Sequence, residues 1–232
     1  MRLDRLLANK AYGSRKEVHQ IIKDRRVTIN GEITTKKDIH IDIDVDTVAV
    51  DGQTVNTTQL YYVKFHKPKG YVTAVEDSSH PVVMDLLPPE YLKMGVVPVG
   101  RLDKDTEGLL LLTNDGVWGH SIINGHKHVP KVYYVEFEGE LSEEGIQRIK
   151  EGIILGDETQ CKPALIELLS DQSATITIEE GKYHQVKRMI GAAGGAVTYL
   201  KRLTIGHVDL RGIEEIGSVM DLTIDEVEGF KK

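Results

Sequence analysis

Four consecutive leucines, residues 109–112, lie between two groups of glycines and charged or turn-forming residues. Residues 100–108 precede them, and Asn114, Asp115 and Gly116 follow. A short apolar run bounded by turn residues is typical of a buried strand. Polar side chains on the loop that enters such a strand are held rigidly by the core, as a reacting group requires. Residues 100–116 therefore predict a central strand with a fixed polar loop at its start.

The composition is that of an ordinary globular protein, with 40% hydrophobic and 28% charged residues in a chain of 232. This length allows one large domain or a small domain followed by a medium-sized one. The single cysteine, Cys161, allows no internal disulfide and favours a reducing compartment. No apolar stretch reaches membrane-spanning length, and the first residues lack the apolar centre of a signal peptide. We therefore expect a cytoplasmic protein with no membrane contact.

Charge is distributed unevenly, although the whole chain has a net charge of −7. Residues 1–37 contain ten Lys and Arg against four Asp and Glu, whereas residues 38–60 contain five Asp and no Lys or Arg. An acidic protein can still bind RNA through a local basic surface, so the net charge does not exclude nucleic acid.

The N-terminal pattern predicts two short helices and a small sheet. Leu3, Leu6 and Leu7 have helical spacing, and Ser14 with Glu17 forms a capping box that starts a second helix. The Asn30–Gly31 pair predicts a hairpin, and alternation of Ile and Val with Asp over residues 41–46 predicts an edge strand.

This stretch resembles an S4-type RNA-binding domain, which we expect to span residues 1–58. The resemblance rests on Leu-Asp-x-x-Leu, Ser-Arg-x-x and Val-x-Ile-Asn-Gly patterns. Basic side chains near both ends of the second helix coincide with the motif. The resemblance implies that they meet RNA phosphates, although a solvated helical face is the alternative; they are Arg15, Lys16, Lys23, Arg25 and Arg26.

Three later stretches, in order, resemble the motifs of pseudouridine synthases, in the branch that acts on ribosomal RNA. They are residues 65–73, Phe-His-Lys-Pro-Lys-Gly-Tyr-Val-Thr; residues 100–109, which begin Gly-Arg-Leu-Asp; and residues 180–190, Glu-Gly-Lys-Tyr-His-Gln-Val-Lys-Arg-Met-Ile. We expect the catalytic domain at residues 59–232, after a polar linker at residues 53–60. Strands outnumber long helices, with the last strand expected at residues 222–224, so the fold class is α+β with a mixed, largely antiparallel sheet.

The resemblance implies that a uridine within RNA is isomerised without redox change or net hydrolysis, so we expect no cofactor and no metal. The target base must be flipped out into a dry pocket beside a carboxylate. Asp103 matches that carboxylate, and we expect the nearby Asp105 and Glu107 to face solvent or cap turns.

Further site residues follow from the same resemblance. Lys187 matches the basic partner of the aspartate, and Arg188 beside it would point elsewhere on a helix. Tyr133 matches the tyrosine that stacks on the target uracil. We expect Thr106 to shape the loop and Leu203 to form part of the pocket wall. We expect Arg101 to fill the gap that the flipped base leaves.

The third motif is most similar to that of the small-subunit branch, which implies uridine 516 of 16S rRNA as the target. Ribosomal RNA is then the partner, as free RNA or within an assembling small subunit, and we expect a monomer. A synthase acting on 23S rRNA and a non-catalytic RNA-binding assembly factor are the alternatives. The sequence leaves open whether Asp103 attacks the base, attacks the ribose carbon or abstracts a sugar proton.

Overall fold

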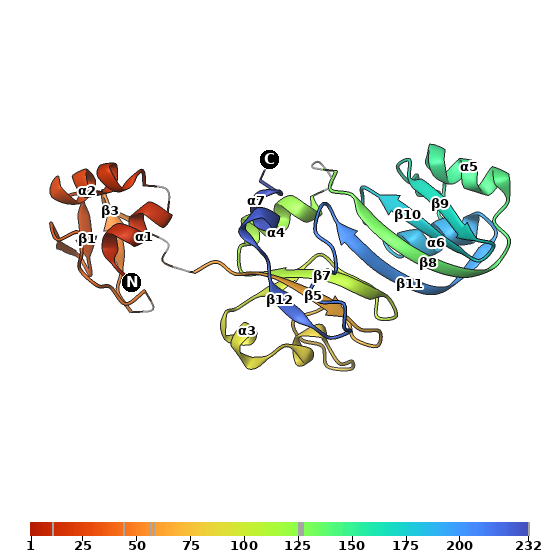
Figure 1. Ribbon diagram of the computed structural model, residues 1–232, viewed down its shortest axis with the longest axis horizontal. Coiled ribbons are helices and arrows are strands. Elements are labelled where there is room, and N and C mark those ends of the chain that lie inside the picture. The colour runs from red at the N-terminus through yellow and green to blue at the C-terminus, as the bar shows by residue number, and fades with distance from the viewer. Residues whose placement is uncertain (11, 44, 56, 58, 125–127, 232) are drawn as a thin grey trace. The chain divides into compact units, whose positions relative to one another are not determined.

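The computed structural model describes residues 1–10, 12–43, 45–55, 57, 59–124 and 128–231. The chain divides into two compact units, Met1–Gln59 and Leu60–Lys232 (Figure 1). None of the helices formed by the described residues is long and apolar enough to cross a membrane.

The N-terminal unit packs two helices, α1 (Leu3–Asn9) and α2 (Arg15–Lys23), on a four-stranded sheet. The predicted capping box is confirmed: the Ser14 hydroxyl accepts from the Glu17 amide, and the Glu17 carboxylate accepts from the Ser14 amide at 2.7 Å. The strands run in the order β2-β1-β3-β4, and their bounds are β1 (Val27–Ile29), β2 (Glu32–Ile33), β3 (Val48–Val50) and β4 (Gln53–Thr54).

Two predictions for this unit are wrong. The described residues between 41 and 46 form a turn instead of an edge strand, because the Asp46 carboxylate accepts both the Asp42 amide and the Asn30 side-chain amide, each at 2.8 Å. The stretch expected as a linker begins with β4, which pairs with β3, and Val55 is buried. Polar sequence therefore hid a short paired strand.

The C-terminal unit is built on one eight-stranded sheet, in the order β12-β5-β7-β11-β8-β10-β9 (Figure 1). Strand β6 pairs with β7 off this path. All pairs are antiparallel except β7 with β11, so the predicted mixed, largely antiparallel sheet is confirmed. The bounds are β5 (Tyr62–Lys67), β6 (Val97–Val99), β7 (Glu107–Thr113), β8 (Lys131–Gly139), β9 (Leu165–Ser170), β10 (Ser173–Ile178), β11 (Gly195–Ile205) and β12 (Val219–Asp221).

Short helices join and flank these strands. They are the 3₁₀ helix η1 (Val83–Leu86) and the α-helices α3 (Pro89–Lys93), α4 (Gly116–Ile123), α5 (Glu143–Glu151), α6 (Gln185–Ala192) and α7 (Ile224–Glu228). The strand predicted at residues 222–224 is wrong. Thr223 instead forms a capping box with Glu226 and starts α7, and the last strand ends at Asp221.

Strand β7 is the centre of this unit, as the leucine run predicts. All four leucines are fully buried. Their alternation sends Leu110 and Leu112 into a cluster with Phe65 and Val135, and sends Leu109 and Leu111 into another cluster around Trp118. One strand thus joins two hydrophobic cores.

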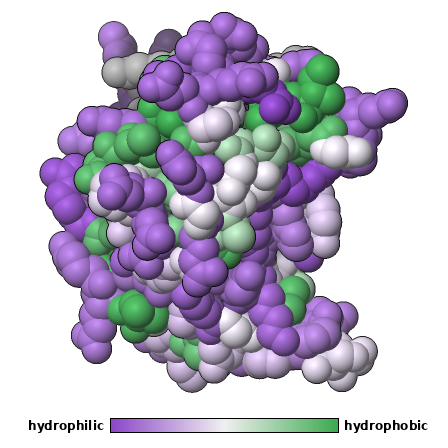
Figure 2. Space-filling model, turned by 90° about the vertical axis from the view of Figure 1, so that its right-hand side faces the viewer, coloured by the Kyte–Doolittle hydropathy of each residue, from purple (hydrophilic) through white to green (hydrophobic). Residues whose placement is uncertain are grey.

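The strand order of the sheet begins with β12 and ends with the edge strand β9. Strand β9 has three exposed leucines, Leu165, Leu168 and Leu169. Figure 2 shows that hydrophilic side chains cover most of this end of the molecule, with separate hydrophobic patches between them.

Gly108 permits the parallel pairing of β7 with β11. Its φ is +115°, and a Cβ built there would lie 2.2 Å from the carbonyl oxygen of Arg202. Because that neighbour is main chain, no side-chain rearrangement could relieve the clash. The glycine therefore sets how closely β11 approaches the start of β7.

We predict that Gly108→Ala destabilises the protein by about 2–4 kcal/mol, since it combines overpacking with an unfavourable φ. Gly191→Ala is the matched control, because Gly191 lies in α6 and a Cβ there meets nothing within 4 Å. Urea unfolding should show a loss for the first variant and no loss for the second. Equal stability of Gly108→Ala and wild type would contradict the close approach.

Candidate active site

The loop between β6 and β7 carries Asp103, and one buried lysine holds it. The Lys67 side chain is fully buried at the end of β5. Its ammonium donates to the carbonyls of Thr106 at 2.8 Å, Pro68 at 2.9 Å, Asp103 at 3.1 Å and Lys104 at 3.4 Å. Three carbonyls of this loop and one from the residue after β5 thus converge on a single charged donor, which fixes the path of the main chain around Asp103.

Thr73 holds the same loop from the other side. Its hydroxyl donates to the Leu102 carbonyl at 2.7 Å and accepts from the Leu102 amide at 3.1 Å. Both contacts are buried, so exchange with water does not weaken them. The residue before Asp103 is therefore fixed as firmly as those after it.

Asp103 faces two groups from the third motif. Its carboxylate lies 3.3 Å from the Lys187 ammonium and 3.5 Å from Nε2 of His184. The structure thus brings the predicted pair, Asp103 and Lys187, together from segments more than eighty residues apart in sequence. His184 was missed because nothing in its sequence context indicates that its ring reaches the aspartate.

Lys187 is shared between two carboxylates. Its ammonium also donates to Asp105 at 2.5 Å, closer than to Asp103. Burial opposes ionisation of Asp105, but the hydrogen bond and charge of Lys187 outweigh it and lower the pKa of that carboxyl. Asp105 is exposed to solvent as expected, yet it also anchors the lysine.

The prediction that Glu107 faces solvent is wrong. Glu107 is the first residue of β7 and is buried. Its carboxylate accepts from the Tyr199 hydroxyl at 2.9 Å and lies 3.2 Å from the Lys201 ammonium. Burial opposes its ionisation, but these partners outweigh it and lower its pKa. Glu107 therefore ties β7 to β11.

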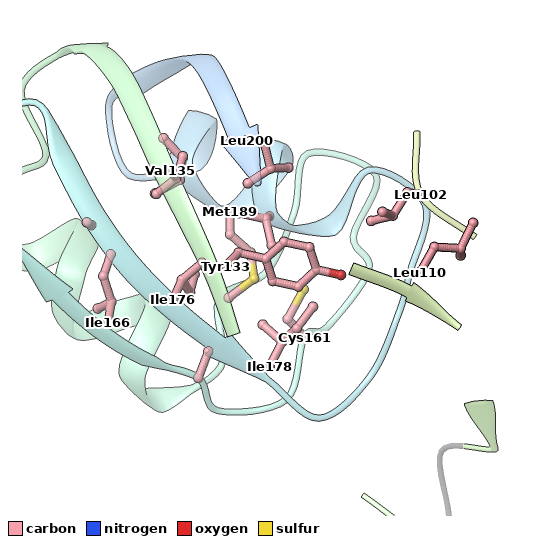
Figure 3. Close-up of a cluster of buried hydrophobic side chains, with 14 of the residues drawn as sticks. Leu102, Leu110, Tyr133, Val135, Cys161, Ile166, Ile176, Ile178, Met189 and Leu200 are labelled. Atoms are coloured by element: carbon pink, nitrogen blue, oxygen red, sulfur yellow. The ribbon is translucent and has the colours of Figure 1, made fainter. Parts of the chain in front are cut away.

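A cavity of about 590 Å³ opens beside Asp103. Tyr133 crosses toward it from the core cluster, with its hydroxyl directed toward Leu102 and Leu110 (Figure 3). A smaller recess adjoins the cavity and is lined by Thr106 and Leu200. The side chains lining the cavity include Arg101, Leu102, Asp103, Lys131, Tyr133, Tyr183, His184, Arg202 and Ile205.

Leu203, expected to wall the pocket, is not among the described residues that line it. Arg202 pairs with Tyr133 across β11 and β8, so these two side chains share a face of the sheet. Leu203 lies where the register of β11 against β8 shifts, between Arg202 and Thr204, so simple alternation along the strand does not place its side chain. Arg202 and Ile205 line the cavity instead, and Leu200 lines the recess beside it.

The mouth of the cavity carries a stacked pair. The rings of Tyr183 and His184 are parallel within 16°, with centroids 3.9 Å apart. Tyr183 is exposed, and His184 has a φ of +47°, which is uncommon for a residue with a side chain. That backbone conformation is found directly before α6, so it sets the direction of the ring that reaches Asp103.

The other predicted residues are placed as follows. Arg188 points away from Asp103 and pairs with Asp157, and its guanidinium also donates to the Tyr183 carbonyl. In the N-terminal unit the five basic residues are exposed. Arg26 pairs with Asp51. Of the other four, Arg15 and Lys16 lie at the start of α2, Lys23 lies at its end, and Arg25 follows it.

Family models match a stretch of each unit. Residues 61–192 match the RNA pseudouridylate synthase family, and residues 1–44 match the S4 domain. The chain belongs to the RNA pseudouridylate synthase family and is a pseudouridine synthase, an isomerase, that carries an S4 domain.

Relatives match over nearly the whole chain. The uncharacterized RNA pseudouridine synthase YtzG of Bacillus subtilis strain 168 is 43% identical, over 98% of this chain and 97% of its own length. Ribosomal small subunit pseudouridine synthase A of Escherichia coli strain K12 is 35% identical, over 98% of each chain. A crystal structure of a pseudouridylate synthase matches with a TM-score of 0.69 and 34% identity, over 99% of each chain.

We predict that the stability contributed by Lys67 depends on pH. Burial lowers the pKa of Lys67 to about 8 from 10.5, although nearby carboxylates oppose the shift. Between these two values the unfolded chain binds the proton and the native protein does not. Stability relative to Lys67→Met should therefore rise with pH across this window, by about 3 kcal/mol in total.

Urea unfolding of both proteins below and above this window measures the difference. Lys131, whose pKa burial also lowers to about 8, is present in both proteins and cancels. A difference that is independent of pH would contradict the assignment of Lys67 as a buried ammonium.

Proposed function

We propose that this protein converts a uridine of small-subunit ribosomal RNA to pseudouridine, and that uridine 516 of 16S rRNA is the target. The resemblance of residues 180–190 to the small-subunit branch supports this target. The names of the relatives support the small-subunit RNA as the substrate, since they include the ribosomal small subunit pseudouridine synthases of Escherichia coli and Yersinia pestis. We further propose that the enzyme acts in the cytoplasm as a monomer, on free RNA or on an assembling subunit.

The observation that carries the proposal is the position of Asp103. Its carboxylate lies beside a cavity large enough for one nucleoside, between the cations Lys187 and His184 when the histidine is protonated, on a loop that Lys67 immobilises. A uridine flipped from the RNA would enter this cavity, and Tyr133 would stack on its ring. Asp103 would then act on the nucleoside while Lys187 keeps the carboxylate charged.

Atoms balance in this isomerisation. The bond from N1 to the ribose C1′ breaks, the base turns, and C5 bonds to C1′; C5 loses a proton and N1 gains one. Arg101, exposed at the rim of the cavity, would occupy the space that the base vacates. The chemistry needs no redox partner, so we propose that the protein works without a cofactor.

We predict that Asp103→Asn abolishes pseudouridine formation while RNA affinity stays nearly unchanged, because asparagine keeps the shape and loses the charge. Asp105→Asn is the matched control: it removes the other partner of Lys187 and should retain most activity. Pseudouridine mapping of 16S rRNA after single-turnover reactions reads out both. Pseudouridine formation by Asp103→Asn, or its complete loss in Asp105→Asn, would contradict the assignment of Asp103 as the catalytic carboxylate.

The same assay on wild-type protein tests the two alternative functions. Modification of 23S rRNA alone would correct the target. Tight binding to ribosomal RNA with no pseudouridine in any transcript or assembling particle would favour an assembly factor.

We predict that the N-terminal unit contributes phosphate contacts. Replacing Arg15, Lys16 and Lys23 with Gln should weaken RNA binding and flatten the plot of log affinity against log salt, by roughly 2 if all three meet phosphates. Arg148 and Lys150, exposed on α5, serve as controls when replaced with Gln. An unchanged slope in the triple variant would show that this helix is not on the RNA.

A further inference from the structure

Arg202 is a buried cation, and part of its guanidinium has no hydrogen-bond partner among the described residues. Its side chain is only 3% exposed. Nε donates to the Leu109 carbonyl at 2.8 Å and Nη1 donates to the Tyr133 hydroxyl at 3.4 Å. Nη2 has no hydrogen-bond partner among the described residues. An unpaired polar group in the interior costs free energy, so it marks a position that a ligand can complete.

No described carboxylate lies within ion-pair distance of Arg202. The other cation on this part of the wall is Lys131, whose ammonium donates to the Val129 carbonyl at 3.0 Å. Burial, together with the charge of Arg202, lowers the pKa of Lys131 to about 8, although the charge of Glu179 opposes the shift. This wall therefore has excess positive charge, opposite in character to Asp103 on the loop.

The pairing of the strands places Arg202 beside Tyr133 in the cavity wall. Tyr133, the proposed stacking residue, pairs with Arg202 across the strands, and its ring centroid is 6.0 Å from the guanidinium. Arg202 itself is brought in by the close approach of β11 to Gly108. A base stacked on Tyr133 would thus have the guanidinium at its edge and within the same water-poor space.

Uracil presents carbonyl oxygens at that edge, and arginine offers only donors. When the bond from N1 to C1′ breaks, its electron pair stays on the base, and the negative charge spreads over the ring nitrogen and the carbonyl oxygens. In two of the roles open to Asp103, attack on the ribose carbon and abstraction of a sugar proton, its carboxylate acts on the sugar side of the same step. The reaction therefore needs a cation beside the base as well as a carboxylate beside the ribose.

We propose that Arg202 binds a carbonyl oxygen of the flipped uracil and stabilises the negative charge on the base while it is detached from the ribose. This role rests on the proposed pseudouridine chemistry. It makes Arg202 part of the cavity wall that binds the base. Arg202 is then a catalytic residue, because it touches the reacting base, and the charge it stabilises is gone once C5 has bonded to C1′ and the C5 proton has been lost.

The test is a leaving-group experiment on the full-length protein. Single-turnover cleavage of the N1–C1′ bond is measured at saturating RNA with uridine or 5-fluorouridine at the target position. Fluorine withdraws electrons and makes the base a weaker base, so its anion needs less help. Arg202→Gln should slow the uridine substrate about 100-fold or more, slow the fluorinated substrate much less, and leave the dissociation constant of the RNA within a few fold.

Three variants separate catalysis from positioning. Arg202→Lys should recover part of the uridine rate, since it keeps a positive charge. Tyr133→Phe removes the hydroxyl that Arg202 contacts; if Arg202 only positions Tyr133, this variant should reproduce the loss, and we expect it not to. Arg211→Gln, an exposed arginine paired with Asp209, should behave as wild type.

The ratio of the two substrate rates is taken on one preparation, so a misfolded fraction of Arg202→Gln cancels. An equal loss for both substrates, an unchanged rate, or an identical loss in Tyr133→Phe would overturn the proposal. Absence of product with wild-type protein would instead count against the proposed target RNA, which keeps the two failures distinguishable.

Discussion

The hydrogen bonds of one buried ammonium fix the geometry on which this site depends. Lys67 leaves the end of β5 and binds carbonyls of residues 68, 103, 104 and 106. A charged donor in a low-dielectric interior makes strong hydrogen bonds, and leaving it unpaired there would be costly. The loop therefore has one favourable path, and Asp103 projects from it beside Lys187 and His184. Rigidity at the main chain is what allows a partly exposed carboxylate to have a defined orientation.

The second constraint is the way β7 serves two cores at once. Its leucines pack alternately into two clusters, so both faces of the strand are buried and each core depends on it. Gly108 then lets β11 come within main-chain contact at Arg202. The result is a cavity whose loop carries the carboxylate and whose sheet wall carries Tyr133 and Arg202. Stability and site geometry thus come from the same strand.

The sequence predicts the features that are local or carried by a motif. The leucine run predicts β7, the Ser14–Glu17 pair predicts the start of α2, and the three motifs indicate Asp103, Lys187 and Tyr133. It fails where a distant side chain decides the structure. Asp46 closes a turn in a stretch that alternates like a strand, and Thr223 caps a helix where apolar residues suggested another strand.

Sequence also fails to place side chains at the contact of β7, β11 and β8, for the same reason. Glu107 looks like a solvated acid until Tyr199 and Lys201 reach it from β11. Arg202 and Leu203 are adjacent in a strand, and sequence alone does not say which of them faces inward. Only the pairing of β11 with β8 assigns Arg202 to the face of Tyr133. Such assignments depend on register, which is set by the whole sheet.

The proposed site can be seen in a crystal structure of the Asp103→Asn variant bound to a 16S rRNA fragment that contains uridine 516. We expect a flipped uridine with its ring stacked on Tyr133, its ribose C1′ beside the side chain at position 103, and a uracil carbonyl hydrogen-bonded to Nη2 of Arg202. A target base that stays within the RNA helix, or one that binds away from this cavity, would contradict it.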